Sequence, residues 1–318
     1  MLRDNLVSDR KPLLSLLAIL MNVFIGFVVL GPAVGLIVAS LTYEGGLMSL
    51  IEATQDSSRH AEIRNQLLIT QAIATLMGLI ILPALHVRLL ERKKLSPFFP
   101  PQEKLFTAIV LVFGIGITFT IAMSPLVEWN TNVTFPEFLK DFEIWAKNAE
   151  SQATNLTKVM TTFAGQGDLI IGLIVIAVLP AIGEEVVFRG LFQNEFLRAS
   201  GNIHVAIWLS AIIFSTIHFQ FYGFLPRLLL GALFGYLYFW SGNLLIPIAA
   251  HFFNNAFGVV MIYLYQNKMT DLNVEDSTSA PITYVLMNLV ITAGLLYYFR
   301  RHYQAIRKNH PADFMNDF

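Results

Sequence analysis

The sequence predicts an all-α, polytopic membrane protein with about eight transmembrane helices and a polar intramembrane cavity. Three observations support this prediction. Hydrophobic residues make up 55% of the 318 residues and charged residues only 14%, whereas a soluble domain usually carries about 25% charged residues. The apolar residues gather in runs of about 20, the length that spans a bilayer as a helix. The ionisable groups within these runs are concentrated in the second half of the chain.

Eight apolar segments are long enough to be transmembrane helices. They lie at about 13–41, 65–87, 105–127, 169–187, 205–221, 226–242, 244–266 and 281–299. The first follows Arg10 and Lys11, as the apolar part of a secretory signal peptide would. It is roughly twice as long as the ~7–15 apolar residues of such a peptide. We therefore expect a retained membrane helix.

Positive charges in the short loops predict the orientation of these helices, because cytoplasmic loops carry the excess of Lys and Arg. Three stretches are basic: the N-terminus with Arg3, Arg10 and Lys11, the loop "RLLERKK" (88–94) and the tail "RRHYQAIRKNH" (300–310). The alternate loop at 43–64 is net acidic, and the loop at 266–281 holds a single lysine. Eight spans with both termini in the cytoplasm satisfy this pattern. We expect the membrane to be the inner (plasma) membrane of a bacterium.

The distribution of polar groups divides the membrane domain into three parts. Residues 1–164 supply nearly uncharged helices and an extracytoplasmic segment, in which "FPEFLKDFEIWAKNAE" favours an amphipathic surface helix without assigned chemistry. Residues 165–266 hold nearly all the intramembrane polar groups, and residues 267–318 form the last helix and a basic tail. The net charge of −1 gives no basic field for nucleic acid. The absence of cysteine excludes disulfides and thiol catalysis.

The stretch "GEEVVFRG" (183–190) places three ionisable residues at the end of an apolar run. Each such residue costs at least ~2.5–3.5 kcal/mol at the centre of a membrane helix. Glu185 and Arg189 are four residues apart and can pair on one helix face. Glu184 points about 100° away and lacks that partner. Different environments separate the acid and base roles of two carboxylates, although a purely structural ion pair remains an alternative for Glu185 and Arg189.

Two further polar clusters lie on separate apolar segments. The first, "FSTIH" (214–218), contains His218, and a lone histidine in an apolar helix is more often a core residue than a site residue. The second, "HFFNN" (251–255), contains His251 and Asn255 on one helix face, with Asn254 close to it. Asparagine also links membrane helices by hydrogen bonds, but a His–Asn pair can direct two donors at one point, as an oxyanion requires. Together the three clusters predict one shared cavity.

The three stretches "EEVVFR" (184–189), "FSTIH" and "HFFNN" match the motifs EExxxR, FxxxH and HxxxN, and they follow one another along the chain in that order. Over about residues 165–265 the chain thereby resembles the CPBP family of intramembrane proteases, which groups type II CAAX prenyl endopeptidases with bacteriocin-processing and bacteriocin-immunity (Abi-like) membrane proteins. The resemblance implies an intramembrane endopeptidase acting on a membrane-embedded or lipid-linked (lipid-modified) peptide. It implies the following roles: Glu184 and His218 activate the water, His251 and Asn255 stabilise the oxyanion, and Glu185 and Arg189 support Glu184.

The resemblance leaves the need for a metal open, because the family has been described as metal-dependent. Zinc would find three ligands in Glu184, His218 and His251, but the chain has no HExxH helix. We favour water activated without metal, and zinc remains the alternative cofactor. The expected partners are the peptide and the lipid bilayer, with no nucleic acid. A non-catalytic peptide-binding or immunity protein is the alternative function, and a transporter ranks last because the two halves show no matching broken helices.

One feature does not fit a simple eight-helix arrangement. Glu184 and His251 fall in the cytoplasmic halves of their predicted spans, whereas His218 falls near the outer end of the span 205–221. At about 1.5 Å per residue, His218 would lie more than ~15 Å from the others. Either the segment 188–203 dips back into the membrane, or the fifth span starts later or is strongly tilted.

Overall fold

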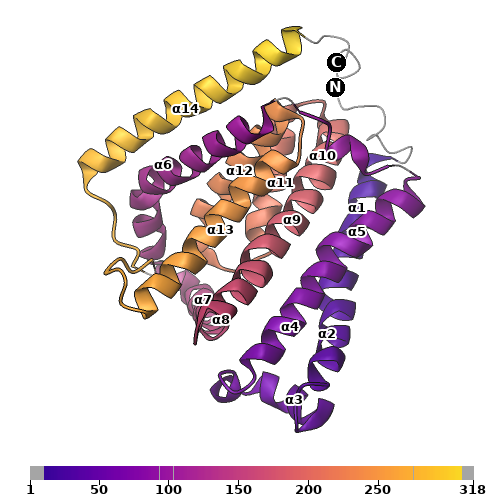
Figure 1. Ribbon diagram of the computed structural model, residues 1–318, viewed down its shortest axis with the longest axis vertical. Helices are drawn as coiled ribbons and strands as arrows, with labels where there is room; N and C mark the ends of the chain where they lie inside the picture. The colour runs from indigo at the N-terminus through magenta and orange to yellow at the C-terminus, as the bar shows by residue number, and fades with distance from the viewer. Residues whose placement is uncertain (1–10, 93, 103, 275, 310–318) are drawn as a thin grey trace.

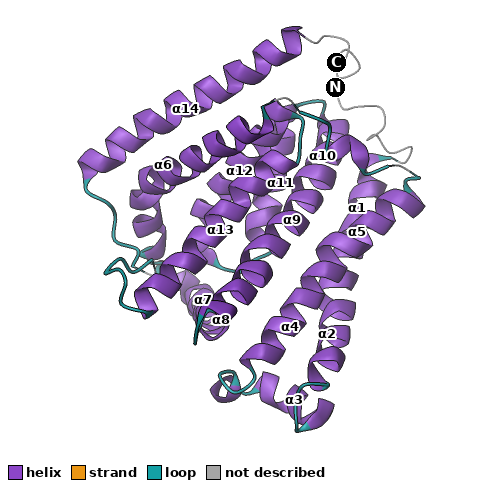
Figure 2. Ribbon diagram, viewed as in Figure 1, coloured by secondary structure: helices purple, strands orange, loops and turns teal. Residues whose placement is uncertain are grey.

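The computed structural model describes residues 11–92, 94–102, 104–274 and 276–309, and side chains up to residue 304. Arg3, Arg10 and the tail from residue 310 therefore lie outside the described residues. The described chain is helical and contains no strand, as predicted (Figure 2). The α-helices are α1 (Pro12–Phe24), α2 (Gly31–Ser40), α3 (Gly46–Gln55), α4 (Arg64–Thr75), α5 (Leu82–Leu85), α6 (Leu105–Thr131), α7 (Lys140–Met160), α8 (Gln166–Gly172), α9 (Leu179–Glu185), α10 (Gln193–Ser200), α11 (Ile203–Thr216), α12 (Phe224–Ser241), α13 (Leu245–Gln266) and α14 (Ile282–Asn309).

Seven helices in the described part of the chain are long and apolar enough to cross a membrane. Three of them join consecutive α-helices through π-helical turns: Pro12–Ser40, Arg64–Leu90 and Gln166–Ser200. Large apolar side chains on these helices remain exposed, for example Leu13 (68%) and Phe106 (79%). Exposed apolar surface on helices of this length is what contact with lipid requires. The chain is an integral membrane protein.

The predicted spans at 169–187 and 205–221 need correction. The first does not end at residue 187 but continues as one helix to Ser200, 35 residues in all. The second is only the 14-residue α11, which ends at Thr216. Fourteen residues rise ~21 Å, less than the ~30 Å hydrocarbon core. After α11, Phe219 adopts a left-handed backbone conformation (φ 53°), which is incompatible with a continuing helix.

The helices form two groups that lie side by side (Figure 1). Helices α1 to α5 make an antiparallel hairpin with α3 at its tip, and α6 to α14 form the larger group. The hairpin packs against α9 at Gly183, where a Cβ atom would lie only 2.6 Å from Cβ of Leu79. A small residue at this position therefore lets the two groups approach closely.

The turns between spans lie at two opposite ends of the molecule (Figure 1). One end holds the start of α1, the loop that follows Leu90, the turns at Gly201 and Gly242, and the end of α14. The other end holds α3 and the amphipathic α7, which begins after the short turn Glu137–Leu139 within the region expected to be helical. The basic loop thus shares an end with the start of the first span, as the predicted orientation requires.

Candidate active site

A helical hairpin brings Glu184 and His218 to the same depth. Its turn reads "SGN" (200–202): Gly201 takes the left-handed conformation (φ 65°), and the Asn202 side chain accepts a hydrogen bond from the backbone N–H of His204 at 2.9 Å. Glycine after a helix end and asparagine before a helix start favour such a turn. Gly201 lies 17 residues after Glu184 and 17 residues before His218. The antiparallel arms therefore place both residues at equal distance from the turn, which resolves the mismatch in depth without a re-entrant segment.

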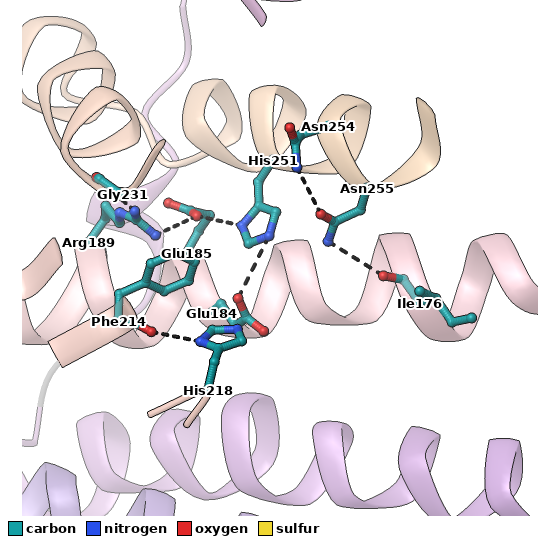
Figure 3. A network of polar contacts seen from close by, with 10 residues as sticks. All are labelled: Ile176, Glu184, Glu185, Arg189, Phe214, His218, Gly231, His251, Asn254 and Asn255. Carbon is teal, nitrogen blue, oxygen red and sulfur yellow. Dashed lines mark hydrogen bonds and ion pairs between the residues drawn. The ribbon is translucent and has the colours of Figure 1, made fainter. Parts of the chain in front are cut away.

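Glu185 is the centre of a buried polar network (Figure 3). Its Oε1 accepts hydrogen bonds from Nη1 of Arg189 at 2.6 Å and from Nδ1 of His251 at 2.7 Å. These three side chains are almost fully buried, with Glu185 itself 0% exposed. Because the ion-paired carboxylate only accepts, the proton of this contact lies on Nδ1 of His251. Among the described residues, Oε2 of Glu185 has no hydrogen-bond partner.

Arg189 connects three helices around the site. Besides its predicted pairing with Glu185, it donates from Nη2 to the carbonyl oxygen of Gly231 at 2.8 Å, on α12. Its guanidinium carbon lies 4.8 Å from the ring centroid of Phe214 and 5.4 Å from that of Phe234. A guanidinium between aromatic faces gains cation–π attraction in a desolvated site. Both Nη atoms of Arg189 are therefore hydrogen-bonded, and its guanidinium also contacts two aromatic rings.

His251 faces both glutamates. Its Nε2 lies 3.7 Å from Oε2 of Glu184, while its Nδ1 contacts Glu185. The imidazole also stacks on Phe234, with ring centroids 5.2 Å apart and planes inclined by 25°. Glu185 and Phe234 thus fix the orientation of the ring. Glu184, whose side chain is 15% exposed, lies on the Nε2 side of the His251 ring.

His218 directs its unbonded ring nitrogen toward the same place. Its Nδ1 lies 2.8 Å from the carbonyl oxygen of Phe214, one turn earlier. A carbonyl oxygen only accepts, so Nδ1 carries the proton and Nε2 is left as the acceptor of the neutral ring. The Phe214 ring lies 5.2 Å from the ring of His218 and 6.0 Å from that of His251. In Figure 3 the Glu184 carboxylate lies between the two imidazoles.

Asn255 lies one turn beyond His251 on α13 and contacts the helix that carries the glutamates. Its Nδ2 donates to the carbonyl oxygen of Ile176 at 3.4 Å, and its Oδ1 accepts from Asn254 at 3.3 Å. Pro180 follows Ile176 by four residues and has no backbone N–H to offer this carbonyl. Side chains commonly satisfy backbone groups freed by proline in membrane helices. The structure thus shows a structural contact for Asn255, which leaves its second amide hydrogen for other partners.

Arg227, one turn before Gly231 on α12, was not among the predicted site residues. Its Nη2 donates to Oε1 of Gln220 at 3.0 Å, and Gln220 in turn donates to Oε1 of Glu150 on α7 at 3.1 Å. The only available signal was a charged residue in the apolar run 221–241. Such residues mark functional sites or buried ion pairs in membrane proteins.

The three proposed metal ligands do not form a metal site in this arrangement. Among the residues that the structure describes, no three His, Asp or Glu side chains group closely enough to hold a metal ion. His251 also directs Nδ1 to Glu185, so only its Nε2 is open to a ligand. The donor types suit zinc, but their placement does not, and no step below depends on a metal.

The comparisons with known proteins fall on the same region. Residues 166–257, which contain all three motifs, match the family described as type II CAAX prenyl endopeptidase Rce1-like. The uncharacterized protein YpbD of Bacillus subtilis is 32% identical over 88 residues, which make up 26% of this chain and 42% of that protein. The chain therefore covers less than half the length of this relative. No solved structure matches the chain. The resemblance to the CPBP family is confirmed for this region.

Proposed function

We propose that this membrane protein is an intramembrane endopeptidase, because residues 166–257 match the Rce1-like family of type II CAAX prenyl endopeptidases. Its substrate is a membrane-embedded or lipid-linked peptide. One observation carries the proposal: Glu184 on α9, His218 directly after the end of α11 and His251 on α13 gather around one polar site (Figure 3). Polar side chains buried in a membrane protein are costly and are retained mainly where they act.

In the proposed mechanism, Glu184 and Nε2 of His218 bind the attacking water. One of them takes a proton from the water as its oxygen bonds to the scissile carbonyl carbon. The carbonyl oxygen becomes an oxyanion in the tetrahedral intermediate. The C–N bond then breaks, and the same group returns the proton to the leaving amine. The products are a new carboxylate and a new amine, so one water is consumed for each bond cleaved.

His251 and Asn255 are the proposed oxyanion donors. Glu185 accepts a hydrogen bond from Nδ1 of His251. The ring can therefore donate from Nε2 only when it carries a second proton. Asn255 contributes the amide hydrogen that Ile176 does not use. Arg189 holds Glu185 and thereby acts on the site through His251, not through the substrate.

The proposed location is a bacterial plasma membrane, with both termini in the cytoplasm. Support comes from the basic loop 88–94, which lies at the same end as the start of α1 and the end of α14. In this orientation α7 covers the extracytoplasmic end.

Cleavage of quenched fluorescent peptides by the protein in lipid vesicles tests the proposed function. We expect the wild type to cleave, and Glu184→Gln to lower the rate at least ~10²-fold, the usual contribution of a positioned general base. Glu195→Gln is the matched control, because Glu195 lies on the same helix, is also buried and pairs with Arg198. We expect it to retain cleavage.

Two outcomes would contradict the proposal. Cleavage that persists in Glu184→Gln would remove Glu184 from the mechanism. Peptide binding without cleavage by the wild type would instead support the non-catalytic peptide-binding function. Mass spectrometry of the products distinguishes these cases, because hydrolysis adds one water to each cleaved bond.

A further inference from the structure

His218 lies in a non-helical stretch between two helices. Helix α11 ends at Thr216, and Phe219, directly after His218, takes a left-handed backbone conformation (φ 53°). A 3₁₀ turn over Phe221–Gly223 then leads into α12, which begins at Phe224. Because the regular hydrogen bonds of a helix are interrupted here, other contacts have to hold this part of the backbone.

Asn130, the last but one residue of α6, holds this stretch with both groups of its side-chain amide. Its Nδ2 donates to the carbonyl oxygen of Phe221 at 3.1 Å, and its Oδ1 accepts from the backbone N–H of Leu225 at 3.0 Å. Asn130 is only 1% exposed, whereas Trp129 and Thr131 on either side of it are exposed. This one buried side chain thus joins α6 to two points of the segment 219–225.

The start of α12 needs this contact because its own sequence supplies no cap. The residue before the helix is Gly223, which has no side chain to accept from the first N–H groups. Ser, Thr, Asp and Asn are the usual residues at that position. The N–H of Leu225, the second residue of the helix, has no acceptor within the helix. Asn130 therefore caps α12 from a helix about 90 residues earlier in the chain.

The same contact bears on the position of His218. The hydrogen bond from Nδ1 of His218 to the carbonyl oxygen of Phe214 orients the ring relative to α11 only. Phe221 follows His218 by three residues, and Asn130 fixes its carbonyl. Buried Ser215 closes the stretch from the other side, since its hydroxyl donates to the carbonyl oxygen of Phe224 at 2.7 Å. The backbone of His218 thus lies between two held points.

We propose that Asn130 is a positioning residue of the site, which holds the segment 219–225 and thereby places His218 for water activation. This assignment rests on the proposed endopeptidase function. Asn130 acts through the backbone and not on the substrate. It lies outside residues 166–257, which match the protease family, so the N-terminal half of the chain takes part in building the site.

Kinetics in the peptide assay test this assignment. Asn130→Leu removes both contacts and should lower kcat about 10-fold to 100-fold with little change in KM, because a small misplacement of a catalytic group has an effect of this size. Asn130→Asp keeps the acceptor for Leu225, and a carboxylate is favoured at a helix N-terminus. It should therefore retain most of kcat.

Two control variants separate positioning from a general loss of structure. Asn132→Leu makes the same substitution at an exposed position directly after α6. Ser241→Ala removes a buried hydroxyl from the opposite end of α12, where it donates to the carbonyl oxygen of Leu237. Both should keep the kcat of the wild type. Asn130→Ala, which removes both contacts without a branched side chain, replaces Asn130→Leu if that variant does not fold.

A nitroxide spin label tests the hold on the segment independently of cleavage. The protein has no cysteine, so a label on Phe219→Cys, at a position that is 65% exposed, reports this segment alone. Asn130→Leu should narrow the electron paramagnetic resonance lines of this label, because the segment moves more freely. The same label on Leu209→Cys, exposed on α11, should give one spectrum with and without Asn130→Leu.

Three outcomes would overturn the assignment: wild-type kcat in Asn130→Leu, an unchanged spectrum at position 219, or equally increased mobility at positions 209 and 219. The last would make Asn130 a general packing residue. A wild type that cleaves no peptide would refute the endopeptidase function instead. The label then still decides the role of Asn130, since greater mobility at position 219 alone would show that Asn130 holds the backbone of His218.

Discussion

Replacing Arg189 by methionine tests the buried network around Glu185. Arg189→Met leaves the Glu185 carboxylate fully buried, with His251 as its one remaining partner among the described residues. Removing one member of a buried ion pair costs about 3–5 kcal/mol. The lost bond to Gly231 and the two aromatic contacts are part of the same cost, because contributions within one network are not additive. At ~2 °C per kcal/mol for a chain of this size, the unfolding midpoint should fall by about 6–10 °C.

Thermal unfolding of the purified protein, followed by the fluorescence of its four tryptophans, measures this shift. Lys140→Met is the control, because Lys140 is exposed and Glu143 keeps its shorter bond to Lys147 at 2.6 Å. An exposed pair contributes only about 0–1 kcal/mol, so the control midpoint should move by at most ~2 °C. The double variant Glu185→Gln/Arg189→Met removes both charges and should melt closer to the wild type than Arg189→Met. If Arg189→Met melts like the control, the buried pair does not hold the site together.

Two further substitutions test the oxyanion donor and the helix packing. Asn255→Ala should lower kcat by about 10²–10³-fold, as loss of an oxyanion donor does. The control Asn254→Ala should retain most activity. Equal activity of the two variants in the peptide assay would remove Asn255 from the mechanism. Gly183→Ala should destabilise the protein by about 1–3 kcal/mol, because the added Cβ would lie 2.6 Å from Cβ of Leu79. The control Gly258→Ala adds a Cβ with no heavy atom within 4 Å. Similar unfolding midpoints of the two variants would show that Gly183 is not a packing contact.

Much of the fold could be predicted because each apolar run is close to the length of a membrane-spanning helix. Helix α13 (Leu245–Gln266) agrees with the predicted span 244–266 to within one residue. The predicted end of the helix that carries Glu184 was wrong. Residues 188–200 mix charged and apolar side chains, and their low mean hydropathy is typical of a loop. In the structure Arg189, Gln193 and Glu195 are buried against neighbouring helices, so protein contacts replace lipid. The signal for the true end was present in "SGN" at 200–202, which repeats the tight turn "SGN" at 241–243.

The motifs predicted which residues of the site gather, but not how they contact one another. Spacing of four residues predicted the pair of Glu185 and Arg189, because both lie on one helix. The contact between His251 and Glu185 joins residues 66 positions apart and depends on how α13 packs against α9. Arg227 was missed for the same reason: its link to Glu150 on α7 passes through Gln220, in an irregular segment between helices. Helix periodicity carries no information on such contacts.

The central claim is that Glu184 and His218 share one site across the hairpin that turns at Gly201. The protein has no cysteine, so pairs of introduced cysteines report proximity without background. We predict that Glu184→Cys/His218→Cys is joined by a short bifunctional thiol reagent, as detected by mass spectrometry of the linked peptides. Glu184→Cys/His204→Cys should not be joined, because His204 lies 14 residues earlier, ~21 Å along the helix axis. Linkage of the His204 pair but not of the His218 pair would contradict the shared site.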